Sequence, residues 1–154
     1  MGQTTDWFLA DIEEAPDLGN ALPEELVDTW PNVSLRDVLE LELEELSKVL
    51  LGPKYVYRTE LLYPEDAASE GGPSVTSEVF EGGTFVTHVP SAFVQALAAL
   101  RDEDISRAGT AWQAKAEHLR DWAPIEVTGV LQRMRDFAAL AARSRKSVLS
   151  VFEA

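Results

Sequence analysis

Three stretches of the chain carry the alternating or β-branched and aromatic side chains that are typical of half-buried β-strands. They are residues 5–12, 55–63 and 146–152. Two further strand-like runs, residues 75–80 and 84–89, are joined by Glu81-Gly82-Gly83 and followed by Pro90. Because glycine tolerates positive φ in a tight connection, this arrangement predicts a β-hairpin.

Apolar residues three or four positions apart predict helices in much of the remaining chain. The first covers residues 41–51 and is closed by Gly52 and Pro53, with Ser34 as the N-cap candidate of the run that leads into it. Residues 35–43 mix both periods, so strand and helix stay open there. Further helices are predicted within 93–100, with Ser91 as cap, and within 105–119 and 124–141. Residues 13–32 are typical of an irregular acidic connection with one short helical turn.

The order of these elements predicts one α+β domain over residues 1–154. Its sheet is small and antiparallel or mixed, built from the N-terminal strand, the central strands with their hairpin, and the C-terminal strand. Three to four helices pack on one face of this sheet. Small, polar, turn-forming residues predict a mobile loop near 64–76. A chain of 154 residues can bury such a core without metal or disulfide staples.

Composition excludes several chemistries. The chain has no cysteine, so disulfides, zinc–cysteine sites, iron–sulfur clusters and thiol nucleophiles are ruled out. Its first residues contain no basic and apolar leader, and no window reaches the length of a membrane-spanning helix. We therefore expect a cytoplasmic protein that does not enter a membrane.

Charge is distributed unevenly along the chain. Of the net charge of −14, residues 1–77 carry −13, from 17 acidic and 4 basic residues, whereas residues 78–154 carry −1. This charge repels phosphate backbones, so nucleic-acid binding is not expected. It would steer association with a basic protein partner, although an acidic surface also serves solubility alone.

Several short features occur in a recognisable order along the chain. They are the Met1-Gly2 start, the Leu-Leu-Gly stop within 49–52, Trp112 and Trp122, the Leu- and Ala-rich stretch 131–142, and the strand 148–152. In this order they resemble a family of small bacterial proteins with no established activity. The resemblance implies a single α+β domain and no particular reaction.

The two histidines are the first candidates for chemistry. His88 lies in a strand whose alternation places it on the face opposite Phe85, Thr87 and Val89, where it could act as a general base, or fill a structural position. His118 lies one helical turn before Trp122, which favours contact between the two rings. Neither histidine has the spacing of a zinc site, and no metal, cofactor or catalytic residue is predicted.

Charged clusters are the other candidates. Residues 102–104 are acidic but lack the spacing of a calcium loop, and they fit an interhelical turn with an N-cap better. Basic residues within 133–146 could bind an anion, or pair with the acidic half of the chain and the end of their own helix. The glutamates of the first predicted helix are expected on a solvated face: Glu40, Glu42, Glu44 and Glu45.

Three functions follow from these observations. The leading hypothesis is a non-catalytic, inhibitor-like binding protein, such as an immunity protein, that engages a basic partner through Glu40, Glu42, Glu44 and Glu45. The second is a small-ligand-binding protein or enzyme whose pocket includes His88, Trp112 and Trp122. The third is a homodimer formed through a strand edge or an apolar helix face.

Overall fold

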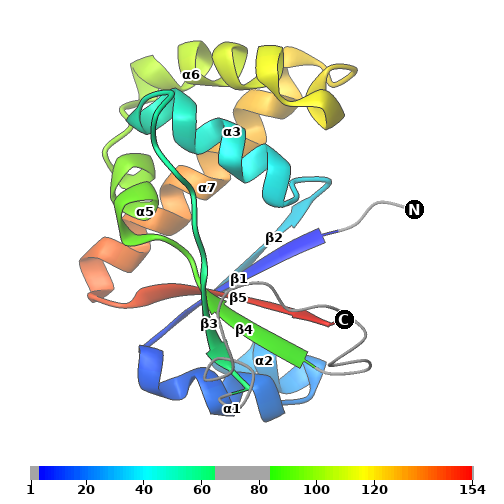
Figure 1. The fold of residues 1–154 in the computed structure, drawn as a ribbon, viewed down its shortest axis with the longest axis vertical. Helices are drawn as coiled ribbons and strands as arrows, with labels where there is room; N and C mark the ends of the chain where they lie inside the picture. The colour runs from blue at the N-terminus through cyan, green and yellow to red at the C-terminus, as the bar shows by residue number, and fades with distance from the viewer. Residues whose placement is uncertain (1–3, 65–83, 154) are drawn as a thin grey trace.

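The sheet at the centre of the molecule has five antiparallel strands in the order β2-β1-β5-β4-β3 (Figure 1). The computed structural model describes residues 4–64 and 84–153. Within these ranges the strands are β1 (Thr4–Ala10), β2 (Asn32–Arg36), β3 (Glu60–Tyr63), β4 (Thr84–His88) and β5 (Ser147–Glu153). The C-terminal strand lies in the middle of the sheet, so β1 and β4 are both held by the last residues of the fold.

Six α-helices and two 3-10 turns lie within the described residues. They are η1 (Ile12–Glu14), α1 (Ala15–Asn20), α2 (Pro23–Thr29), α3 (Glu40–Leu51), α5 (Ser91–Ala98), α6 (Asp102–Lys115), η2 (Glu117–Leu119) and α7 (Pro124–Ser144). The predicted α+β fold is confirmed, as are the helices at 41–51, 93–100 and 124–141, whereas the helix predicted within 105–119 ends at Lys115 and is followed by η2. No helix in the described ranges combines the length and apolar character needed to cross a bilayer.

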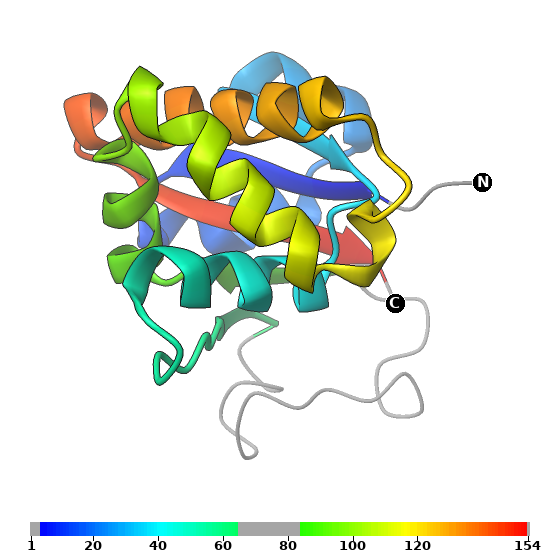
Figure 2. The ribbon, with the colours of Figure 1, turned by 90° about the horizontal axis from the view of Figure 1, so that it is seen from above.

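Helices cover both faces of the sheet (Figures 1 and 2). On one face, α3, α5, α6 and α7 enclose the larger core, which includes Trp7 and Leu9 from β1. This agrees with the predicted three to four helices on one face. On the other face, α1 and α2 pack over Phe8, Val86 and Leu149, and this second layer was not predicted.

Several local predictions differ from the structure. Ser34 is not an N-cap, because it lies in β2, where its hydroxyl donates to the Asp6 carboxylate. The strand expected at 55–63 shortens to β3, and residues 13–32 form three short helical elements. Ser91 begins α5, whereas the N-cap is Pro90. Residues 102–104 form the first turn of α6, after Arg101 at the N-cap.

The predicted hairpin is only partly within the described residues. β4 matches its second strand, and its two edges pair with β3 and β5. The alternation predicted there is confirmed, since Val89 enters the larger core and Val86 the smaller one. The other strand at 75–80 and most of the loop predicted near 64–76 lie outside the described residues.

Glutamates fix the starts of several helices. The third residue of η1, α2, α3 and α7 is a glutamate whose carboxylate accepts the backbone N–H of the N-cap residue. Three of these N-caps, Leu22, Leu39 and Ala123, have no side-chain acceptor of their own. Negative charge in a first turn also complements the helix dipole. Some of the acidic residues of the chain therefore stabilise the fold.

Replacing Gly19 on α1 tests how closely this helix packs against Tyr63 of β3. A Cβ at Gly19 would lie 2.3 Å from Cδ1 of Tyr63, so Gly19→Ala should destabilise the protein by about 1–3 kcal/mol. The matched control is Gly129→Ala in α7, where a Cβ meets nothing within 4 Å. There, alanine should stabilise by about 0.5–1 kcal/mol. Urea unfolding measures both, and equal stabilities of the two variants would contradict this packing.

Candidate functional site

A cavity of about 340 Å³ lies between the sheet and the first turn of α3. Its floor is a row of neighbouring residues across the strands: Trp7 pairs with Ser150, and Ser150 with Thr87. The two small hydroxyl residues stand on the sheet face that otherwise carries the larger apolar core. Because Ser and Thr fill less space than Leu or Phe, this part of the face leaves room under α3.

The other walls come from two segments. Leu39, Glu40 and Leu43 lie above the floor, and Tyr57 and Thr59 line the side from the extended chain before β3. The cavity is therefore mainly apolar with several hydroxyl groups at its boundary, which is the usual character of small-molecule sites.

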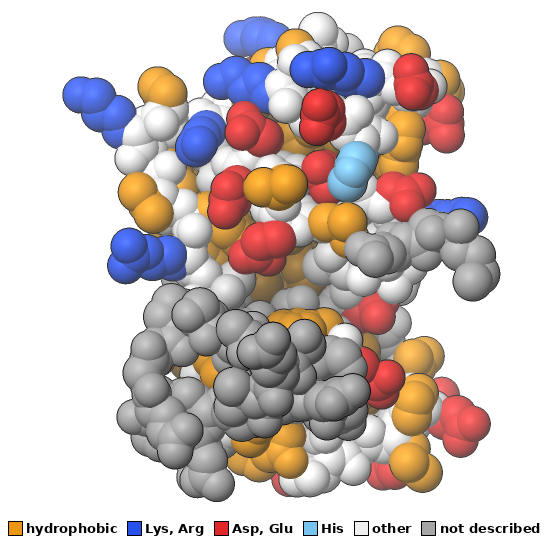
Figure 3. All heavy atoms as spheres, turned by 45° about the vertical axis from the view of Figure 1, so that its right-hand side comes forward, with side chains coloured by type: hydrophobic (Ala, Val, Ile, Leu, Met, Phe, Trp, Pro, Cys, Tyr) orange, Lys and Arg blue, Asp and Glu red, His pale blue; other side chains and the backbone are white. Residues whose placement is uncertain are grey.

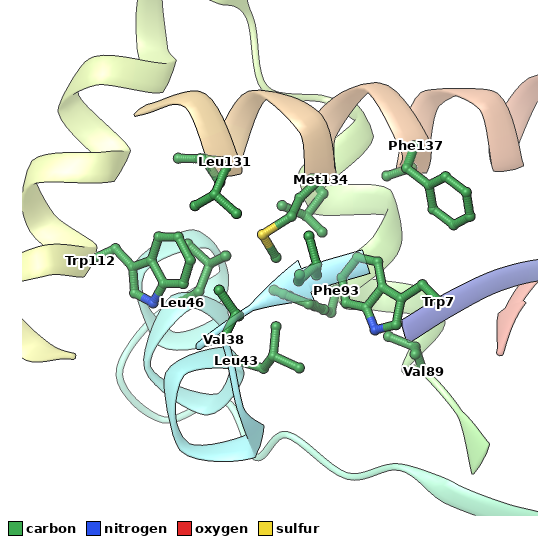
Figure 4. Packing of buried hydrophobic residues seen from close by; sticks show 14 of the residues in the cluster. Trp7, Val38, Leu43, Leu46, Val89, Phe93, Trp112, Leu131, Met134 and Phe137 are labelled. Carbon is green, nitrogen blue, oxygen red and sulfur yellow. The ribbon is translucent and has the colours of Figure 1, made fainter. Parts of the chain in front are cut away.

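The indole of Trp7 is the most unusual part of the cavity lining. Its side chain is fully buried, and Nε1 has no hydrogen-bond partner among the described residues. Figure 4 shows the nitrogen edge turned away from α7 and lying between Leu43 and Val89 in that view. Both of these residues line the cavity. A buried donor without an acceptor costs about 1–3 kcal/mol, so a molecule that reached this N–H with an acceptor atom would recover that cost.

Aromatic contacts hold the Trp7 ring in place. Phe93 meets it edge to face, with ring centroids 6.4 Å apart, and Phe137 packs against it at 6.5 Å. Phe93 in turn meets Tyr57 edge to face at 5.4 Å. Two walls of the cavity, Trp7 and Tyr57, are thus positioned through one shared ring.

The charge of the cavity comes from Glu40. The side chain of Glu40 is partly exposed, and partial burial of its carboxyl, followed by the negative charge of Glu44, raises the pKa of Glu40 above its ordinary value of 4.5. Burial, with Glu40 next, also raises the pKa of Tyr57, so the phenol stays neutral. No lysine, arginine or histidine is among the described lining residues. Figure 3 shows acidic side chains gathered on the helical part of this face, around a hollow with hydrophobic side chains behind it.

Glu42 does not lie on a solvated face as predicted, because its side chain is only 3% exposed. Its carboxylate accepts the N–H of Leu39 at 3.0 Å and lies 3.1 Å from Nδ1 of His118. The carbonyl of Glu42 accepts the indole N–H of Trp112 at 2.8 Å. These buried contacts join α3 to α6 and η2, and they remove Glu42 from any surface that a partner could contact.

The remaining predicted site residues lie in different places. Glu44 and Glu45 are half-buried on α3. Trp112 is fully buried, and Trp122 packs against the edge of the same core. His88 lines a separate hollow of about 310 Å³ with residues of α5, α7 and β5, and neither tryptophan takes part in it. The structure therefore does not gather His88, Trp112 and Trp122 around one pocket.

Among the residues that line the cavity, only Glu40 was a candidate site residue from the sequence. One signal was present: Thr87 stands between Phe85 and Val89 on the inward face of its strand, and Ser150 stands between Val148 and Phe152. Hydroxyl residues at inward positions can mark a site instead of a filled core. That Trp7 lies beside them requires the pairing of β1 with β5, which the sequence pattern does not specify.

Comparison with known proteins assigns no function to this site. Comparison of the chain with protein-family models, with curated proteins and with solved structures found no match. Within the described ranges, no group of three or more His, Asp or Glu side chains is arranged to hold a metal ion. The interpretation of the site therefore rests on its own residues.

The raised pKa of Glu40 predicts a pH-dependent stability. Because the folded protein holds this proton more tightly than the unfolded chain, the free energy of unfolding falls as pH rises above about 4.5. Glu40→Gln should therefore be more stable than the wild type at neutral pH, with the difference closing below pH 4.5. Urea unfolding over this pH range measures it. Glu45→Gln, on the same helix but outside the lining, is the control, and an identical profile for both variants would contradict the burial of the Glu40 carboxyl.

Proposed function

We propose that this protein binds a small, largely apolar molecule in the cavity between β1, β5, β4 and α3. The observation that supports this most concerns Trp7, which lines the cavity and whose buried N–H has no acceptor among the described residues. A ligand with one acceptor atom would restore the missing hydrogen bond while it covers the apolar walls. The proposal keeps the small-ligand hypothesis from the sequence but places it on different residues.

The walls favour binding because they are fixed before a ligand arrives. Trp7 is held by Phe93 and Phe137, and Leu43 lies in α3, whose first turn is anchored to α6. A preorganised pocket has less conformational entropy to lose on binding. A volume of about 340 Å³ is at the lower end of the range for ligand sites, so the molecule is compact.

The four tryptophans of the chain provide the test. Each contributes one indole N–H signal to a proton–nitrogen correlation spectrum, and Trp→Phe variants assign them. In a screen of small aromatic and aliphatic fragments, a binder should move the Trp7 signal downfield as its N–H gains an acceptor. The Trp112 signal is the internal control, since its N–H already donates to the Glu42 carbonyl.

Filling the cavity should abolish this response. Ser150→Leu adds bulk to the floor, whereas Gly129→Ala changes a position with open space around it and serves as the matched control. Fragments should lose at least about tenfold in affinity for the filled variant only, as expected when a ligand's apolar contacts are removed. Binding that leaves the Trp7 signal unmoved, or that survives Ser150→Leu, would contradict the proposal.

A second candidate function is the binding of a basic protein partner through α1 and α2. Residues 12–29 contain six acidic and no basic residues. Leu22 and Val27 are exposed among them, at 61% and 59%. Charge would steer a basic partner to this surface and the apolar side chains would bind it. α1 and α2 therefore offer a basic partner a more accessible acidic surface than α3, where Glu42 is buried.

Charge reversal tests this second candidate. Glu24→Lys combined with Asp28→Lys should remove a basic partner that the wild type retains from host lysate at low salt and releases at high salt. The control is the reversal of one acid on the far layer, Glu103→Lys. If the α2 variant retains the same proteins as the wild type, α1 and α2 are not the binding surface.

A further inference from the structure

We propose that the ligand of the cavity is an arylalkylamine, with its ammonium group at Glu40 and a hydrogen-bond acceptor on its ring facing the N–H of Trp7. This inference rests on the proposed function, since it names the chemical class of the molecule that the cavity takes.

The charge of the lining selects against anions. Glu40 is the one charged side chain among the described lining residues, and no ion pair or hydrogen bond of its carboxylate is found within the described part of the chain. By contrast, the carboxylate of Glu42, two residues on, is used twice inside the protein. Glu44 adds a second negative charge near Glu40. A phosphate or carboxylate would meet repulsion here, whereas an ammonium group would supply the missing counter-charge.

Burial makes this preference stronger. The Glu40 carboxyl is partly removed from water, which is why its pKa is raised. An ammonium group beside it would stabilise the ionised form, and the hydrogen bond between the two would be charge-assisted. The groups that face Glu40 are Glu44 on its own helix and Tyr57 on the opposite wall, and neither is a cation.

The aromatic side chains that line the cavity fit the ring of the proposed ligand. Trp7, Tyr57 and Phe152 all line the cavity, and Phe152 is stacked on Phe85 with ring centroids 5.3 Å apart. Their faces and edges accept an aromatic ring, and they also attract a nearby cation. The hydroxyls of Thr87 and Ser150 stand on the floor beside Trp7, so a polar atom on the ring would meet them and the indole N–H together.

A matched set of probes tests the inference with the intact protein. Tyramine carries both the ammonium and the ring oxygen; tyrosol replaces the ammonium by a hydroxyl, and para-hydroxyphenylacetate replaces it by a carboxylate. Titrations at neutral pH, followed by calorimetry and by the Trp7 indole signal, should give tyramine about tenfold higher affinity than tyrosol. The carboxylate should bind more weakly than either.

Variants then locate the preference. Glu40→Gln should remove the advantage of tyramine over tyrosol and leave the binding of tyrosol unchanged. Glu45→Gln, which takes the same charge from the same helix outside the lining, should keep the advantage. Phenethylamine, which lacks the ring oxygen, should bind without the downfield shift of the Trp7 N–H that tyramine causes.

The outcomes separate this inference from the proposed function. If tyrosol binds as tightly as tyramine and moves the Trp7 signal, the cavity binds ligands but not cations, and the inference is wrong while the proposed function stands. If Glu45→Gln lowers the tyramine preference as much as Glu40→Gln does, the effect is one of net charge and the inference is again wrong. If no probe moves the Trp7 signal, the inference is wrong, and the fragment screen alone decides whether the proposed function stands.

Discussion

The position of the first turn of α3 is the constraint on which the rest of the structure depends. The buried Trp112 indole donates to the Glu42 carbonyl, the Glu42 carboxylate caps Leu39, and the Thr5 hydroxyl donates to the Val38 carbonyl. Together these bonds tie the helix to α6 on one side and to β1 on the other. Because both ties are buried or partly buried hydrogen bonds, moving the turn onto the sheet would break them at a cost of about 1–3 kcal/mol each. The space above Ser150 and Thr87 therefore stays open.

The acidic residues that the structure describes differ in what they contact. Glu14, Glu25, Glu42 and Glu126 each cap the start of a helix and stabilise the fold through backbone N–H groups. Glu40 has no such contact within the described residues and lies at the cavity, where burial raises its pKa. The excess negative charge of the first half is thus partly structural, and only some of it is free to act on a ligand or a partner.

Much of the fold could be predicted from the sequence, because periodicity reports which residues are buried on each element. The long helix at 124–144 and the alternation around His88 follow directly from it. Several of the failures share one cause: they depend on pairing between distant segments. β2 is recognisable only from its pairing with β1, which the sequence pattern does not specify, and Glu42 appears solvated until Trp112 and His118 are placed against it. The cavity needs β1, β5, β4 and α3 together, so the sequence pointed instead to isolated histidines and tryptophans.

The proposed function depends most on the orientation of the Trp7 ring. The most direct measurement is therefore the set of nuclear Overhauser effects from the Trp7 indole proton in the free protein. The structure predicts contacts to the methyl groups of Leu43 and Val89, which line the cavity. Contacts to α7, such as the Met134 methyl, would show the N–H buried in the core on the other side of the ring and would contradict it.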